Sequence, residues 1–150
     1  MDSELVARLR GVIPRLARQL NETSTGEGLT PTQYSVLALV RNRGPIGLTE
    51  LTELEGINPT MLSRVVKALD EGGLIRRLPN LADGRATRVE VTEEGTLLHE
   101  RVKVQRTEVM AQCLAGMPEE TARVLLAVVP ALESLAEALQ APARAHRDGR

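Results

Sequence analysis

The side chains best suited to recognising another molecule lie on a predicted helix that begins at Pro59. Its solvent-facing polar positions are three, four or seven residues apart and so share one face: Thr60, Ser63, Arg64 and Lys67. The guanidinium of Arg64 can donate two hydrogen bonds, to O6 and N7 of guanine, and short hydroxyls permit a close approach of the backbone. Exposed amides at a helix start also favour a nearby phosphate. This face is suited to contact with DNA.

The elements around this helix have the order of a winged helix-turn-helix. In chain order they are a short helix over 49–56, a sharp turn, the helix from Pro59 to Gly72-Gly73, and strands over 74–78 and 87–92. The turn-rich loop between the two strands predicts a hairpin. In such a unit the second helix enters the major groove. An isolated arginine on a helix is more often only solvated, and this context favours contact for Arg64.

Amphipathic helices are predicted ahead of this unit. Apolar residues spaced by three and four over 3–21 indicate one helix, and Pro14 either kinks it or divides it into two starts, because proline removes a backbone hydrogen bond. A second helix is expected from Thr30 to the break at Gly44-Pro45. Thr30 and Gln33 have the spacing of a capping box.

Two more helices are predicted after the hairpin. One begins near Thr92, and its apolar pattern places Cys113 inside as a buried structural thiol, in preference to a redox switch. The other begins at Pro118 and should bend at Pro130. Residues 141–150 have no apolar face and are predicted to be disordered.

Composition argues against several classes of protein. The 150 residues carry a formal net charge of −1, but residues 58–90 hold six basic and four acidic side chains, a net charge of +2. Tyr34 is the only aromatic side chain, which disfavours single-stranded nucleic acid binding by base stacking. Cys113 with the distant His99 and His146 makes a poor metal set, and no nucleophile–base pair or glycine-rich phosphate loop indicates an enzyme. With no signal-peptide pattern and no membrane-length apolar run, we expect a cytoplasmic protein without cofactors.

These motifs together resemble the multiple antibiotic resistance regulator (MarR) family of transcription factors. The resemblance covers almost the whole chain and rests on Leu29–Leu37, Asn58–Arg77, Asp83-Gly84-Arg85 and Val91–Gly95. Family members are homodimers whose first and last helices interlock while two winged domains hold DNA. The resemblance implies a mainly α fold with a small β-hairpin wing, flanked by dimerisation helices. The implied divisions are a dimerisation helix and loop over 1–28, the DNA-binding domain over 29–92, dimerisation helices over 93–140 and a tail over 141–150.

The resemblance also assigns roles to individual residues. The implied DNA-binding residues are Asn58, Pro59, Thr60, Ser63, Arg64, Lys67, Arg77, Asp83, Arg85 and Arg88. Among them, Arg85 would enter the minor groove, Asp83 would orient it, and Arg77 would brace the wing. The implied dimer interface comprises Leu5, Leu9, Val128, Leu132, Leu135 and Leu139. A pocket for a small aromatic or phenolic anion would be lined by Leu16, Leu20 and Val36, with Arg18 as the partner of the anion.

The function implied is that of a homodimeric regulator that binds double-stranded DNA in a sequence-specific manner. A dimer would place two recognition helices about 34 Å apart and would select a pseudo-palindromic operator. Repression that a small-molecule effector relieves is the favoured mode, and activation instead would depend on where the operator lies. Two alternatives are a winged-helix module that binds proteins without specific DNA binding, and a constitutive DNA binder that has no ligand.

Overall fold

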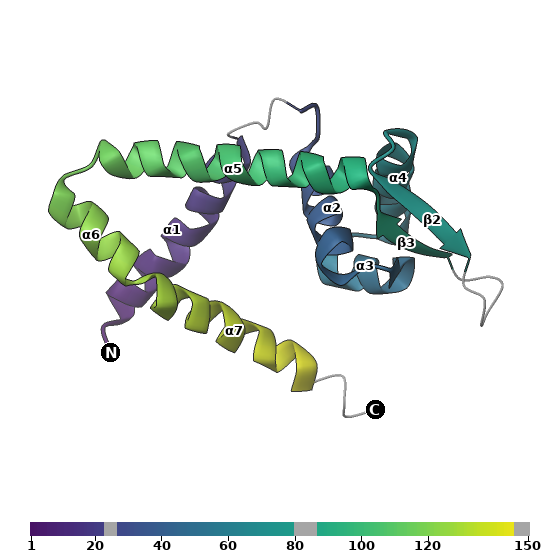
Figure 1. Cartoon of the computed structure of the whole chain (residues 1–150). Helices are drawn as coiled ribbons and strands as arrows, with labels where there is room; N and C mark the ends of the chain where they lie inside the picture. The colour runs from purple at the N-terminus through teal and green to yellow at the C-terminus, as the bar shows by residue number, and fades with distance from the viewer. Residues whose placement is uncertain (23–26, 80–86, 146–150) are drawn as a thin grey trace. The chain divides into compact units, whose positions relative to one another are not determined.

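The computed structural model describes residues 1–22, 27–79 and 87–145 (Figure 1). Its helices are α1 (Ser3–Glu22), α2 (Pro31–Arg43), α3 (Leu48–Glu55), α4 (Pro59–Glu71), α5 (Glu93–Ala115), α6 (Glu119–Ala127) and α7 (Val129–Ala145). Its strands are β1 (Ile46–Gly47), β2 (Ile75–Pro79) and β3 (Thr87–Val91). The chain divides into two compact units, Met1–Thr107 and Glu108–Arg150, and the winged helix-turn-helix lies entirely within the first. The predicted class, mainly helical with a small β wing, is confirmed.

One antiparallel sheet joins the three strands in the order β1-β3-β2. Strands β2 and β3 form the predicted hairpin, in which Ile75 lies opposite Val91. Strand β1 pairs with the other edge of β3 and places Ile46 opposite Val89. Strand β1 was not predicted, because two residues are too few to show the alternation that identifies a strand.

Aliphatic side chains from helices α2 to α5 and from the sheet form the core of the first unit. The side chains with the least exposure are Val36, Leu37, Val40, Ile46, Leu51, Leu62, Val66, Leu69, Ile75, Val89 and Val102. The predicted inward face of α4 is confirmed, since its apolar positions at 62, 65, 66 and 69 are all buried. Burial of this face leaves the opposite side of α4 to solvent.

Side-chain hydrogen bonds confirm two predicted helix starts. The hydroxyl of Thr30 accepts from the amide of Gln33 at 3.2 Å, and the Gln33 side chain accepts from the amide of Thr30 at 3.0 Å. Asn58 Oδ1 accepts from the amide of Met61 at 2.8 Å. Each cap satisfies an amide that has no partner within its helix and contributes about 1 kcal/mol. The caps therefore fix where α2 and α4 begin.

Helix α1 runs without interruption through Pro14, so the alternative of two separate helix starts is wrong. Pro14 cannot donate to the carbonyl of Arg10, but one lost hydrogen bond does not end this helix of 20 residues. None of the α1 side chains is buried. Its apolar face is in contact with solvent, with Leu5 56% and Leu16 52% exposed.

Two predictions for the C-terminal helices are corrected. The expected single bent helix is two helices, α6 and α7, separated at Val128. Pro130 has no amide to donate to the carbonyl of Leu126, so regular helical bonding stops there. Helix α7 also continues to Ala145, although disorder was predicted from residue 141 onward.

The prediction of a buried thiol is also wrong, because Cys113 is exposed. The buried positions of α5 lie in its first half and end at Val102, so the helix has already left the core of the first unit when it reaches Cys113.

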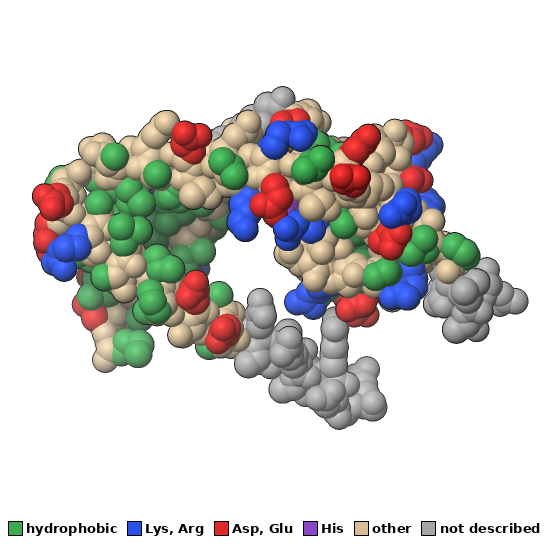
Figure 2. All heavy atoms as spheres, viewed as in Figure 1, with side chains coloured by type: hydrophobic (Ala, Val, Ile, Leu, Met, Phe, Trp, Pro, Cys, Tyr) green, Lys and Arg blue, Asp and Glu red, His purple; other side chains and the backbone are tan. Residues whose placement is uncertain are grey.

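Helices α6 and α7 carry hydrophobic side chains on their surfaces (Figure 2). The exposed ones are Val124, Leu125, Leu126, Val128, Val129, Leu132 and Leu139. None of the described helices is both long enough and apolar enough to cross a membrane.

Candidate DNA-binding surface

Helix α4 separates apolar and polar side chains onto opposite faces. The apolar positions that include Leu62, Val66 and Leu69 are buried, whereas Thr60, Ser63, Arg64 and Lys67 are all exposed. The residues predicted to face DNA are thus brought together on one accessible surface, and the core holds the helix behind them. Hydroxyl and guanidinium groups in this arrangement can form hydrogen bonds with base edges in a major groove.

The turn between α3 and α4 sets the direction of this surface. Gly56 has a φ of 71°, a left-handed conformation, and its amide donates to the carbonyl of Thr52 at 3.0 Å. A side chain at this position would be strained at that φ. Ile57 packs against the core directly after the turn, and Asn58 then caps α4. The predicted helix-turn-helix geometry is therefore present.

Arg77 extends from β2 toward the end of α4. Its Nε lies 3.5 Å from Oδ2 of Asp70, so an ion pair connects the hairpin to the candidate recognition helix. On α4 itself, Lys67 lies 3.9 Å from Glu71, one helical turn further along. Both pairs are exposed and contribute little to stability. They set side-chain directions on the surface.

Arg88 is exposed on β3, and one of its guanidinium nitrogens donates to the backbone carbonyl of Pro45 at 2.7 Å. This hydrogen bond attaches the central strand of the wing to the segment that leads into β1. Elsewhere in the hairpin, Arg76 of β2 lies opposite Glu90 of β3 and forms an ion pair with it at 2.5 Å. The predicted wing-tip residues Asp83 and Arg85 lie outside the described residues.

The four residues predicted to form an effector pocket do not come together. Val36 is fully buried in the core, Leu16 and Arg18 are exposed on α1, and Leu20 is partly buried near the end of that helix. None of them lines the cavity beside Tyr34, which lies in the described part of the first unit. That cavity has a volume of about 360 Å³ and is lined by Asn21, Pro31, Thr32, Tyr34, Ser35, Ala38, Glu55 and Arg106.

Charged and aromatic groups meet beside this cavity. The ring of Tyr34 stacks on the imidazole of His99, with centroids 5.3 Å apart and planes 4° apart. The guanidinium of Arg106 lies over the Tyr34 ring, 4.3 Å from its centroid. Burial raises the pKa of Tyr34, so the phenol is neutral near pH 7. Ser35 donates to Glu55, the last residue of α3, at 2.8 Å.

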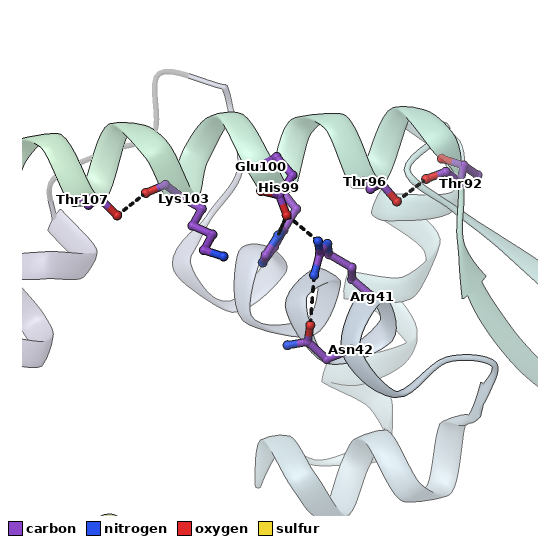
Figure 3. Close-up of polar contacts among 8 residues, drawn as sticks. All are labelled: Arg41, Asn42, Thr92, Thr96, His99, Glu100, Lys103 and Thr107. Carbon is purple, nitrogen blue, oxygen red and sulfur yellow. Dashed lines mark hydrogen bonds and ion pairs between the residues drawn. The ribbon is translucent and has the colours of Figure 1, made fainter. Parts of the chain in front are cut away.

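A network of polar contacts continues from His99 to the end of α2 (Figure 3). Glu100 forms an ion pair with Arg41, and Arg41 also donates to the side chain of Asn42 at 3.3 Å. We call Tyr34, Arg41, His99, Glu100 and Arg106 the His99 cluster. Burial and then the Arg41 charge lower the pKa of His99 below its ordinary value of 6.5, Glu100 opposes them, and Lys103 lowers it further.

The His99 cluster was missed at the level of sequence. From the sequence, His99 is considered as a metal ligand, and Tyr34 is considered as evidence of aromatic scarcity and as part of the Leu29–Leu37 motif. One signal was present: His99, Lys103 and Arg106 lie four and seven residues apart and therefore share a face of α5. Their meeting with Tyr34 and Arg41 depends on how α2 packs against α5, which periodicity does not give.

Comparison with known proteins agrees with this geometry. Residues 29–87 match the family model described as "MarR family". The chain is 27% identical over 118 residues to the HTH-type transcriptional repressor MdtR of Bacillus subtilis, covering 79% of this chain and 76% of the relative. It is 30% identical over 116 residues to an uncharacterized HTH-type transcriptional regulator of Mycobacterium bovis, covering 77% and 81%.

A solved structure of the multiple antibiotic resistance repressor MarR superposes with a TM-score of 0.69 at 26% identity, covering 89% of this chain and 93% of that one. Sequence and fold thus point to the same group of regulators. The chain belongs to the MarR family of winged-helix, DNA-binding transcriptional regulators, which are not enzymes.

Proposed function

We propose that this MarR-family regulator is a homodimeric repressor that binds a pseudo-palindromic operator and is released by a small-molecule effector. The main support for DNA binding is the amphipathic helix α4. Its buried apolar face fixes the position of an exposed row of hydroxyl and basic side chains. Repression is supported by the names of two similar proteins, the repressors MdtR and MarR.

Direct reading of bases is assigned to Thr60, Ser63 and Arg64. The Arg64 guanidinium can bind guanine through two parallel hydrogen bonds, which specify a base as well as add affinity. By the family resemblance, Arg85 enters the minor groove of the flanking DNA, where narrow A·T-rich sequence attracts an arginine, and Asp83 orients it.

Dimerisation is supported by apolar side chains left in contact with solvent. Leu5 and Leu9 are exposed on α1, and Leu132 and Leu139 are exposed on α7, with Leu139 69% exposed. Val128 between α6 and α7 is also exposed, and Leu135 is partly buried. Extended exposed apolar surface is unfavourable in water and marks interaction sites. A second copy of the chain is the partner that a two-fold symmetric operator requires.

The effector part is supported by the cavity beside Tyr34 and Arg106. Arg106 supplies a positive charge and Tyr34 an aromatic ring, so the lining suits a small aromatic anion. The anion partner that we propose is therefore Arg106 on α5, in place of the predicted Arg18. Glu55 lines the same cavity and ends α3, so a ligand there would act on the helix that positions α4. A ligand can release DNA only by binding the released arrangement more tightly.

The experiment that tests the DNA-binding proposal is selection of bound sequences from random DNA, followed by affinity measurements on the selected site. We expect a pseudo-palindrome whose half-sites are separated by about one helical turn. Arg64→Ala should cost about 1–3 kcal/mol and relax the preference at one base pair. Arg64→Lys is the matched control: it keeps the charge without the two-pronged geometry, so it should recover affinity more than specificity. Unchanged affinity and preference in both variants would contradict the assignment.

The effector proposal is tested by thermal shift with a set of small aromatic carboxylates and phenolates. A ligand of the cavity should raise Tm and weaken operator binding, and Arg106→Gln should abolish both effects. Arg18→Gln, which removes the same charge from α1, is the control and should respond as the wild type does. Loss of the response in the α1 variant alone would move the site to α1, and no response to any compound would favour a constitutive DNA binder.

A further inference from the structure

One carboxylate oxygen of Glu100 lies close to two basic side chains and is bound to one of them. Glu100 Oε1 accepts from Arg41 Nη2 and also lies 3.9 Å from Nδ1 of His99 (Figure 3). The side chain of His99 is 9% exposed, and its Nδ1 has no hydrogen-bond partner among the described residues. An unpaired buried nitrogen is costly, and such an atom calls for a functional explanation.

We propose that His99 is a proton-operated switch between α2 and α5, in which the protonated imidazole takes the Glu100 carboxylate from Arg41 and releases the end of α2. A proton on Nδ1 would turn this atom into a charged donor facing the oxygen that Arg41 now occupies. The two cations would then compete for one carboxylate oxygen in a partly buried site, where charge interactions are strong. The arrangement therefore has two states, distinguished by the partner of Glu100.

The charges around His99 favour a protonated imidazole over Arg41 in the competition for the Glu100 carboxylate. From α2 it faces the neutral Tyr34 and the cation Arg41; from α5 it faces Glu100 and Lys103, with Arg106 on the Tyr34 ring. Glu100 is thus the one anion among these neighbours. A further positive charge at His99 repels Arg41 while it attracts Glu100, so protonation strengthens one pair at the expense of the other.

The end of α2 is connected to the wing through strand β1. Arg41 is in the last turn of α2, and the chain continues through Gly44 and Pro45 to strand β1, which pairs with β3. The carbonyl of Pro45 accepts from Arg88 of β3. Release of Arg41 would therefore loosen residues 44–47, which connect α2 to strand β3 of the wing. We expect acidification to weaken operator binding for this reason. This consequence rests on the proposed DNA-binding function. The change of partner of the Glu100 carboxylate, from Arg41 to His99, does not.

Tyr34 provides a direct readout of the exchange, since it is the only tyrosine in a chain without tryptophan or phenylalanine. Its emission reports the surroundings of this one ring, which stacks on His99 and also lies under Arg106. We expect a fluorescence transition with a midpoint below pH 6.5, the ordinary pKa of histidine. His99→Gln should abolish it, and His146→Gln, which removes the only other histidine, should preserve it. A transition that survives His99→Gln would overturn the proposal.

Two charge variants distinguish a switch from a histidine with a structural role alone. Glu100→Gln removes the charge that raises the pKa of His99, so the midpoint should move to lower pH. Arg41→Met removes a charge that lowers the pKa and frees the carboxylate, so the midpoint should move to higher pH. NMR of the imidazole in His146→Gln, where His99 is the sole histidine, gives the same pKa without altering His99. Equal midpoints in all variants would overturn the exchange.

Operator affinity at about pH 7.5 and about pH 5.5 tests the regulatory consequence, because histidine titrates between these values. Relative to His99→Gln, the wild type should lose roughly fivefold or more in affinity on acidification, the lower end of typical coupling between sites. Parallel pH dependence in the two proteins would overturn this consequence. Absence of operator binding at both pH values would instead overturn the proposed function, and the fluorescence midpoints decide the carboxylate exchange in either case.

Discussion

Arg77 Nε lies 3.5 Å from Asp70 Oδ2, so an ion pair joins the first strand of the wing to the last turn of α4. Exposed pairs of this kind stabilise a fold by about 0–1 kcal/mol. We therefore expect Arg77→Ala to change Tm little. Its operator affinity should fall several-fold, because the wing loses its fixed direction relative to α4. Fluorescence anisotropy with a labelled operator would measure the loss.

Asp70→Asn separates bracing from direct contact with DNA. If Arg77 acts through Asp70, this variant should weaken binding much as Arg77→Ala does, and the double variant should be no weaker than either single one. If Arg77 instead binds a phosphate, removal of a nearby negative charge should strengthen binding. Stronger binding by Asp70→Asn would therefore contradict the bracing role.

Lys67 is exposed on the polar face of α4 and belongs to the predicted DNA-binding set, and we expect it to contact a phosphate. Lys67→Gln should weaken binding equally for all sequences and reduce the slope of log affinity against log salt by about one. Lys103→Gln is the matched control, because Lys103 is the only other lysine and lies on α5. Titrations over a range of salt concentrations would measure both slopes, and equal reductions in the two variants would argue against a local contact.

Asn58 caps α4 and was also predicted to belong to the DNA-binding set. Asn58→Ala should lower the free energy of unfolding by about 1 kcal/mol, and Asn58→Ser, which retains an acceptor, should recover most of it. Urea denaturation measures the stability, and anisotropy measures the affinity. If the serine variant regains stability but not operator affinity, Asn58 contacts DNA in addition to its role as a cap.

The depressed pKa of His99 makes stability depend on pH in a definite direction. An unfolded chain binds a proton at His99 near pH 6.5, whereas the folded chain does so only at lower pH. The folded state therefore binds fewer protons in this window, and stability that is fully present above about pH 6.5 is lost as the pH falls. His99→Gln should flatten the decline of Tm between about pH 6.5 and pH 5, and His146→Gln should not. Identical curves would contradict the depressed pKa.

The exposed apolar side chains of α7 give a test of dimerisation. Leu132→Glu places a charge on the predicted interface, so analytical ultracentrifugation should detect monomers, and affinity for a two-half-site operator should fall. Leu97→Glu is the control: Leu97 is also exposed, but it lies on α5 outside the predicted interface residues. Dissociation caused by the Leu97 variant, with the Leu132 variant intact, would place the interface elsewhere.

The sequence predicted those parts of the fold that depend on interactions between residues close together in the chain. Caps at Thr30 and Asn58, the glycine turn at Gly56 and the buried positions of α4 follow from rules that operate within a few residues. The exposed row that includes Arg64 follows from the same helical period. Its prediction as a DNA-contacting surface was therefore possible without a structure.

Features that depend on packing between distant segments could not be predicted in this way. Strand β1 exists because Ile46 meets Val89, 43 positions away in sequence, and no local pattern marks it. Tyr34 stacks on His99 only because α2 packs beside α5. Likewise, the exposure of Cys113 reflects where α5 leaves the core, a boundary that its own apolar pattern does not show.

The strand order β1-β3-β2 makes β2 an edge strand of the sheet, where unpaired backbone groups could pair with a strand from another molecule. The sequence of β2, Ile-Arg-Arg-Leu-Pro, places two positive charges on this edge strand. The strand ends with a proline, which has no amide hydrogen to donate. Charged side chains at positions 76 and 77 disfavour packing against an added strand, and Pro79 would interrupt its ladder of hydrogen bonds. The same short segment that presents the wing thus protects the protein against intermolecular β-aggregation.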